Sequence, residues 1–138
     1  MGAIKIDLDT KDTPWMAFGH RIAFIERHLE LSISEVQVHD TNKGYHIYLY
    51  FEKEIPDMAI VAIQAILGSD WRRETYNARR VTNGTPAWNV LFIKKSKDGK
   101  VISEEKFNQA ITDALLFEIN SEMMSWEGIS AIESINAI

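Results

Sequence analysis

Residues 41–51 read TNKGYHIYLYF, a tight turn followed by an alternating segment. Asparagine, lysine and glycine at 42–44 are typical of a hairpin turn, and residues 35–39 before the turn alternate in the same way. This part of the chain therefore predicts a β-hairpin. In residues 45–51 the more aliphatic face is expected to be buried, so the opposite face presents His46, Tyr48 and Tyr50.

The N-terminal segment Ile4–Asp9 has the same alternation. Its isoleucines and leucine share one face, and the other face carries Lys5, Asp7 and Asp9. A period of two residues is typical of a strand with one buried face. Both aspartates are therefore expected to point away from the core, as His46 does.

Two amphipathic helices are expected between the strands. An apolar stripe with spacings of three and four runs through residues 15–29, after Thr13 as the cap and Pro14 in the first turn. A second apolar stripe follows Pro56, and Gly68 is well placed to end that helix. Both helices can therefore cover a sheet.

The rest of the chain is expected to supply a basic helix, a fourth strand and a helical C-terminal part. Ser69 or Asp70 is placed to cap the basic helix, residues 71–80, and the β-rich run 88–95 follows after turn residues. Apolar residues then recur at helical spacing in two groups, namely Phe107, Ile111, Ala114, Leu115 and Ile119, followed by Ile129, Ile132, Ile135 and Ile138.

The resulting order of elements, βαββαβ, predicts an α+β fold of the split βαβ type, also called RRM-like or ferredoxin-like. Two right-handed crossovers place the first and third strands side by side in an antiparallel sheet, with both helices on one face. Residues 1–100 are expected to form this core, and residues 101–138 a helical C-terminal extension of the same domain. On the uncovered face, Asp7 and Asp9 then lie beside His46.

Composition limits the classes of protein. The chain has 138 residues, of which 46% are hydrophobic and 25% charged, and this suits one ordered, soluble domain. Because it has no cysteine, disulfides, thiolate nucleophiles and cysteine-ligated metal sites are excluded. No apolar run approaches the roughly 20 residues that span a bilayer, and the first residues lack the pattern of a signal peptide. We therefore expect a cytoplasmic protein with no membrane partner.

The positive charges are unevenly distributed. The net charge of −5 does not by itself favour a nucleic-acid partner. Two short stretches are nevertheless basic, one with Arg72, Arg73, Arg79 and Arg80 and one with Lys94, Lys95, Lys97 and Lys100. Trp71 precedes the arginines, and a mixture of aromatic ring and cation favours contacts to phosphates and bases. We therefore expect the arginines to bind nucleic acid.

The predicted open face carries the residues with the clearest chemistry. Two aspartates at i and i+2 on a strand project in parallel, and such oxygen ligands suit Mg²⁺ or Mn²⁺ that also binds nucleotide phosphates. His46 beside them can bind a phosphate oxygen or donate a proton, and Tyr48 and Tyr50 offer rings on which bases can stack. Each feature alone is more often an ordinary surface residue, so the hypothesis rests on their meeting on one face.

Two segments resemble the catalytic core of the archaeo-eukaryotic primase and primase-polymerase superfamily. IKIDLDT, with Asp7 and Asp9, is similar to the D-x-D strand of that family, and TNKGYHIYLYF, with Gly44 and His46, is similar to its second motif. The resemblance implies an RRM-like catalytic unit in which Asp7 and Asp9 bind the divalent metal and His46 contacts the phosphate of the incoming nucleotide. It also implies a role in DNA replication. Because the chain is short for such an enzyme, we expect a reduced relative borne by a virus or plasmid, and the cysteine-free, isoleucine-rich composition suits a mobile element of an archaeon.

Other functions stay open, because the aspartate expected in the family's third motif has no counterpart between Trp88 and Lys94. The alternative enzyme is a rolling-circle nuclease of the same topology. There, His46-Ile47-Tyr48 is similar to the His-hydrophobic-His strand, and Tyr76 is the nucleophile that attacks DNA. A third class needs no catalysis: the sheet and the arginines bind single-stranded nucleic acid, or the C-terminal helical region joins copies of the chain into a homo-oligomer.

Overall fold

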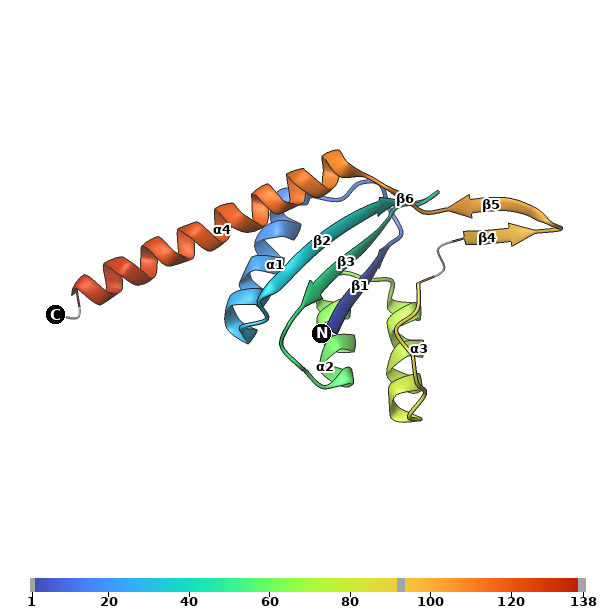
Figure 1. The fold of residues 1–138 in the computed structure, drawn as a ribbon, viewed down its shortest axis with the longest axis horizontal. Coiled ribbons are helices and arrows are strands. Elements are labelled where there is room, and N and C mark those ends of the chain that lie inside the picture. The colour runs from blue at the N-terminus through green and yellow to red at the C-terminus, as the bar shows by residue number, and fades with distance from the viewer. Residues whose placement is uncertain (1, 92–93, 137–138) are drawn as a thin grey trace.

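The computed structural model describes the backbone of residues 2–91 and 94–136, and the side chains of residues 2–91, 96–101 and 104–124. Within this part of the chain, four helices accompany a four-stranded antiparallel sheet and a separate two-stranded sheet (Figure 1). The predicted α+β class is therefore confirmed. None of the described helices is long and apolar enough to cross a bilayer.

The elements follow one another along the chain as β1 (Gly2–Leu8), α1 (Trp15–Leu29), β2 (Ile33–Asp40), β3 (Tyr45–Phe51), α2 (Asp57–Ile66), α3 (Trp71–Thr82), β4 (Lys94–Lys97), β5 (Lys100–Glu104), β6 (Lys106–Phe107) and α4 (Gln109–Asn136). The main sheet has the order β1-β3-β2-β6, and all neighbouring strands are antiparallel. The predicted hairpin and the predicted adjacency of the first and third strands are therefore confirmed.

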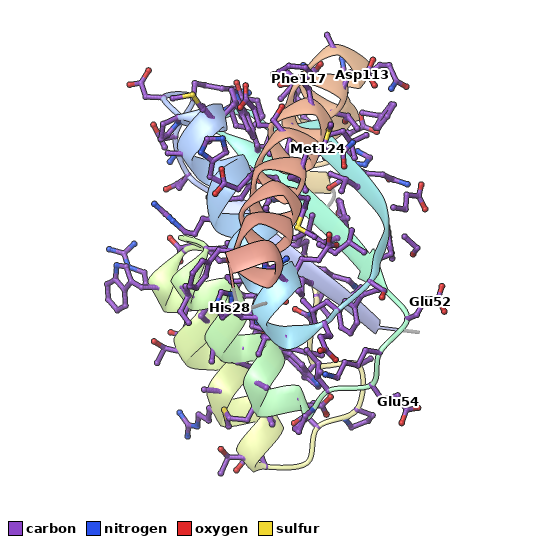
Figure 2. The ribbon with its side chains drawn as sticks, turned by 90° about the vertical axis from the view of Figure 1, so that its left-hand side faces the viewer. His28, Glu52, Glu54, Asp113, Phe117 and Met124 are labelled. Atoms are coloured by element: carbon purple, nitrogen blue, oxygen red, sulfur yellow. The ribbon has the colours of Figure 1, made fainter. Side chains whose placement is uncertain are left out.

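One face of the main sheet is buried under helices. Alternate residues of its three long strands pack against α1, α2 and the first half of α4, and the sheet side of this core consists of Ile4, Ile6, Leu8, Val36, Val38, Tyr45, Ile47, Leu49 and Phe51. The helix α4 lies along α1 and extends beyond the sheet, with Phe117 and Met124 on its exposed side (Figures 1 and 2). Because successive side chains of a strand point to opposite faces of the sheet, the residues between these core positions face away from all three helices.

The turn between β2 and β3 fixes the path of the chain after β1. A Cβ atom at Gly44 would lie 1.7 Å from the carbonyl oxygen of Leu8, so no larger residue fits there. The backbone N–H of Thr41 donates to the Gly44 carbonyl at 3.0 Å, and Thr41 Oγ1 accepts from the Gly44 N–H at 3.0 Å. The turn therefore lies directly against the end of β1, where Asp9 follows.

The fourth strand of the predicted split βαβ sheet is not found beside β1. Residues 88–91, the first half of the predicted strand 88–95, are not in a strand, and β4 pairs with β5 in the separate sheet. The fourth strand of the main sheet is β6, which pairs with β2 instead. The split βαβ arrangement is therefore not confirmed beyond its three long strands.

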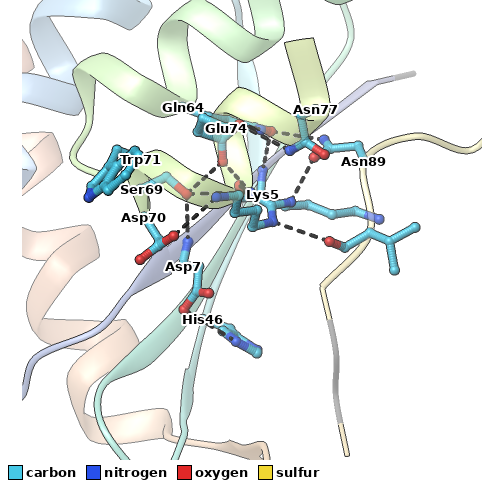
Figure 3. A network of polar contacts seen from close by, with 12 residues as sticks. Lys5, Asp7, His46, Gln64, Ser69, Asp70, Trp71, Glu74, Asn77 and Asn89 are labelled. Carbon is cyan, nitrogen blue, oxygen red and sulfur yellow. Dashed lines mark hydrogen bonds and ion pairs between the residues drawn. The ribbon is translucent and has the colours of Figure 1, made fainter. Parts of the chain in front are cut away.

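Side chains cover the outer edge of β1 in place of a strand (Figure 3). The carbonyl of Ala3 and the N–H and carbonyl groups of Lys5 and Asp7 at this edge are hydrogen-bonded to the segment from α2 to the loop after α3. The partners are Asn89 Nδ2 for the Ala3 carbonyl at 3.2 Å, Gln64 Oε1 for the Lys5 N–H at 2.9 Å, Arg73 Nη1 for the Lys5 carbonyl at 2.8 Å, Ser69 Oγ for the Asp7 N–H at 3.0 Å and the Asp70 N–H for the Asp7 carbonyl at 2.8 Å. These bonds satisfy the groups that an additional strand would have paired.

Details of three helix ends were predicted. Asp70 caps α3 as predicted, since its side chain accepts from the backbone N–H of the third helical residue at 3.0 Å. Thr13 does not cap α1: Pro14 occupies the cap position, and Thr13 Oγ1 is buried without a hydrogen-bond partner among the described residues. Phe107 belongs to β6 and not to the C-terminal helix. The predicted stripe of isoleucines at 129–138 falls on side chains outside the described residues.

Candidate functional site

The register of the sheet brings Asp7 and His46 together (Figure 3). They are directly opposite one another on β1 and β3, and Nε2 of His46 lies 3.6 Å from Oδ1 of Asp7. Their neighbours Ile6 and Ile47 are buried in the core, so the two polar side chains lie on the face opposite α1 and α2. The predicted meeting of these two residues, far apart in the sequence, is therefore confirmed.

The centre of this face is less open than predicted, because Glu105 lies over it. Oε2 of Glu105 accepts from the Tyr48 hydroxyl at 2.7 Å and lies 2.8 Å from Nδ1 of His46. Oε1 of the same carboxylate lies 3.4 Å from Nδ1 of His39, which is the register partner of His46 on β2. As a result, His46 is 7% exposed and Tyr48 8% exposed. A buried polar network thus replaces the uncovered platform that we expected.

The two tyrosines of this face stack on one another. The rings of Tyr48 and Tyr50 are nearly parallel, with centroids 6.4 Å apart, and Tyr50 is half-buried. Burial and the hydrogen bond to Glu105 raise the pKa of Tyr48, so its hydroxyl stays protonated and continues to donate. Tyr48 therefore contributes to the network, and it has little ring surface left for a base.

The carboxyl group of Asp7 lies in an unfavourable electrostatic environment. Its pKa is raised above the ordinary value, mainly because burial disfavours the charged form. The electrostatic interactions with His46 and Arg73 oppose this effect, whereas those with Asp70 and Asp9 add to it. A bound cation would relieve both the burial penalty and the repulsion, so Asp7 has the environment expected of a functional carboxylate.

A cavity of about 490 Å³ opens between this cluster and α3. Its wall combines three acidic side chains, four cationic ones, a histidine and a tyrosine, namely Asp7, Asp9, Glu105, Lys43, Arg72, Arg73, Arg80, His46 and Tyr76. Tyr48, Tyr50 and Arg79 do not line it. A second cavity of about 570 Å³ contains only one acidic residue, Asp57, and one lysine, Lys5, on its wall. Most of the predicted site residues therefore share the first cavity.

The arginines of α3 have different surroundings. Arg73 is nearly buried, donating to the carbonyls of Lys5 and Val90 at 2.8 Å and 3.1 Å, and it forms an ion pair with Glu74. Arg72 is exposed and lies over the ring of Trp71, 5.3 Å from its centroid, and Arg80 is also exposed. Arg73 thus attaches α3 to β1, while Arg72 and Arg80 present charge to the cavity.

A buried carboxylate holds α3 in this position (Figure 3). Glu74 is 3% exposed and accepts from Gln64 Nε2 at 2.7 Å, Ser69 Oγ at 2.7 Å and Asn77 Nδ2 at 3.1 Å, besides its ion pair with Arg73. A buried charge is tolerated where its lone pairs are satisfied in this way. The network therefore gives the cavity one rigid wall.

Asp7 and Asp9 are the residues best suited to hold a metal ion. Mg²⁺ is commonly bound by one or two carboxylates, with substrate phosphates and water completing its coordination. Both aspartates line the cavity, and the pKa of Asp7 is raised mainly because burial disfavours its charge. Among the described residues, no group of three or more histidine, aspartate or glutamate side chains is arranged to hold a metal by itself. The donor set therefore fits a cation that arrives with a phosphate ligand.

Comparisons with known proteins found no significant match to this chain among family models, curated proteins or solved structures. The site is therefore defined by its own geometry. Four of its residues were not predicted as site residues from the sequence, namely Glu105, Asp70, His39 and Lys43. The alternation of residues 35–39 already placed His39 on the same face as His46, whereas Glu105 gave no signal of its position.

Proposed function

We propose that the cavity beside α3 binds a nucleotide together with a divalent cation, and that the chain is a replication protein related to primase-type nucleotidyltransferases. One observation carries the proposal: a single cavity gathers the two strand aspartates and His46 with exposed arginines from α3. Carboxylates alone suit a cation and arginines alone suit an anion. Carboxylates and arginines in one cavity suit a metal-bound phosphate.

Each group has a role in this proposal. Asp7 and Asp9 hold Mg²⁺ or Mn²⁺, which neutralises phosphate charge when it is bound. Arg72 and Arg80 bind the remaining phosphate oxygens from the opposite wall, with Lys43 at the β2–β3 turn. The four cations and three acids on the wall give it one net positive charge, and a divalent cation would raise this further. The wall is then complementary to a triphosphate.

His46 contacts the phosphate in the same proposal. The Glu105 carboxylate at Nδ1 favours the form that carries the proton on Nδ1, and it fixes the orientation of the ring. Nε2 then faces Asp7 and the cavity. His46 can therefore bind a phosphate oxygen when it is doubly protonated.

The proposed relationship extends to the fold. The order β1-β3-β2, with acids on the first strand and the histidine on the third, is the centre of the RRM-like sheet that the sequence resemblance implies. Glu105 is a further acid at the wall of the cavity, so an additional carboxylate at the site need not come from a fourth strand. The proposal therefore includes catalysis of nucleotide transfer.

Calorimetric titration of dATP in the presence of Mn²⁺ tests the binding. We expect Asp7→Asn to weaken binding at least about tenfold, a loss of about 1.4 kcal/mol, because half of the carboxylate pair is removed. Asp113→Asn on the exposed side of α4 is the matched control and should leave affinity unchanged (Figure 2). Incorporation of nucleotides on a single-stranded template should likewise be reduced in Asp7→Asn and unchanged in Asp113→Asn. Equal binding by both variants would contradict the proposal.

A second candidate function has one observation in its favour. Tyr76, which a rolling-circle nuclease would use as nucleophile, is 59% exposed and lines the same cavity as His46. Such an enzyme would form a covalent phosphotyrosine with single-stranded DNA, visible on a denaturing gel and lost in Tyr76→Phe. Tyr76→Phe should instead leave nucleotide incorporation nearly intact if the first proposal holds.

A further inference from the structure

The strands β4 and β5 form a two-stranded ribbon that projects from the rest of the molecule (Figure 1). They are antiparallel, with Lys97 opposite Lys100 and Lys94 opposite Glu104. Asp98 and Gly99 form the turn, and both have the positive φ angles, 53° and 75°, of a tight hairpin turn. The ribbon lies outside the main sheet, so it contributes little to the core.

The ribbon carries a charge opposite to that of the rest of the chain. Residues 94–104 contain four lysines and two acids, Asp98 and Glu104, a formal charge of +2, whereas the whole chain has −5. All other residues together therefore have −7. Lys97 and Lys100 at the tip are exposed. A basic arm on an acidic body has the electrostatic character of a surface for an anionic partner.

Both ends of the ribbon are close in sequence to residues that line the candidate site. Leu91 precedes it and Glu105 follows it, and both residues line the cavity that contains Asp7 and Asp9. A partner that lies along the ribbon therefore has a path to the mouth of the cavity. This position favours a partner that the site itself uses over an unrelated one.

We propose that the ribbon binds the phosphate backbone of a single-stranded nucleic acid that leads into the cavity. The proposal rests on the proposed nucleotide function and adds the partner strand to it. The described ribbon residues have no aromatic ring, so the contacts are expected to be made by lysines to phosphates, without sequence preference. Lysine on an extended arm suits such point-charge contacts.

The salt dependence of binding tests this directly. The probe is a fluorescein-labelled 20-nucleotide oligothymidylate, measured by fluorescence anisotropy over a range of salt concentrations. Each phosphate contact on a single strand contributes about 0.7 to the slope of log K against log salt. Lys97→Gln with Lys100→Gln should therefore reduce the slope by about 1.4.

Arg21→Gln with Lys53→Gln is the matched control, because it removes the same charge from exposed positions on α1 and just after β3. This variant should keep the wild-type slope. Equal slopes for the two double variants would overturn the ribbon proposal. Competition by polyglutamate as effective as by unlabelled oligonucleotide, at equal charge, would overturn the assignment of the partner to nucleic acid.

The same ribbon variant separates the two proposals. Its calorimetric affinity for dATP with Mn²⁺ should equal that of the wild type, since neither lysine lines the cavity. If wild type and variant both fail to bind dATP, while the salt slope still falls by about 1.4, the cavity proposal fails and the ribbon still binds single strands. If dATP binds and the slope is unchanged, the ribbon proposal alone is wrong.

Discussion

Replacement of Glu105 by glutamine is expected to destabilise the protein, because this carboxylate organises the centre of the polar face. Its side chain is 13% exposed, and its Oε2 has two short contacts, 2.7 Å to the Tyr48 hydroxyl and 2.8 Å to His46 Nδ1. A hydrogen bond to a charged group contributes about 1.5–3 kcal/mol, and a neutral one about 0.5–1.5 kcal/mol. When glutamine replaces the charged acceptor of both hydrogen bonds by a neutral one, the free energy of unfolding should fall by about 2 kcal/mol.

Urea denaturation measures this loss as a lower midpoint at unchanged slope. In a thermal melt, about 2 kcal/mol corresponds to a decrease of roughly 8 °C for a domain of this size. The control is Glu104→Gln, an exposed acid one position earlier in β5, which should change stability by less than about 0.5 kcal/mol. Equal stability of the two variants would refute the structural role of Glu105.

Three further predictions concern the residues around the site. Because the pKa of Asp7 is raised, the folded state binds its proton more tightly, so stability should fall as pH rises from the ordinary aspartate pKa through the raised value. Asp7→Asn should remove this fall and, with a side chain 33% exposed, stabilise the metal-free protein by up to about 1 kcal/mol at neutral pH in urea titrations. Glu74→Ala should cost about 3–5 kcal/mol in the same assay, since it leaves Arg73 buried without its partner, whereas alanine at the exposed Glu52 should cost little (Figure 2). Gly44→Ala should lower stability by about 3 kcal/mol because its Cβ would overlap the Leu8 carbonyl. Gly84→Ala, with φ of 70° but open space, should cost about 1 kcal/mol in thermal melts.

The central part of the fold was predictable because it follows from local patterns. The period of two in β1 and β3, with a turn that demands glycine, fixes which residues face the core. The meeting of Asp7 with His46 then follows from strand order alone. These features depend on residues close in sequence or on the general right-handedness of crossovers. Both can be inferred from a single sequence.

Two features could not be predicted: the absence of the strand expected beside β1, and the burial of the polar face under Glu105. Both depend on long-range contacts that cannot be inferred from a single sequence. The run 88–95 has strand-like composition, but the β1 edge that it would have joined is already bonded to side chains such as Gln64 and Arg73. Strand propensity is overridden by such tertiary contacts. Glu105 contacts His46 from 59 positions away, and no periodicity marks it. The network that buries the site therefore became visible only in three dimensions.

Paramagnetic broadening by Mn²⁺ in NMR spectra tests the central claim most directly, because it locates the metal without requiring catalysis. With substoichiometric Mn²⁺ and excess dATP, we predict selective broadening of the His46 imidazole and the Asp9 amide, at the cavity between β1, β3 and α3. Signals of Lys53, outside this cavity, should stay sharp, and Asp7→Asn should abolish the selective effect. Broadening centred on another part of the molecule, or none beyond that of free Mn²⁺, would contradict a metal-bound nucleotide in this cavity.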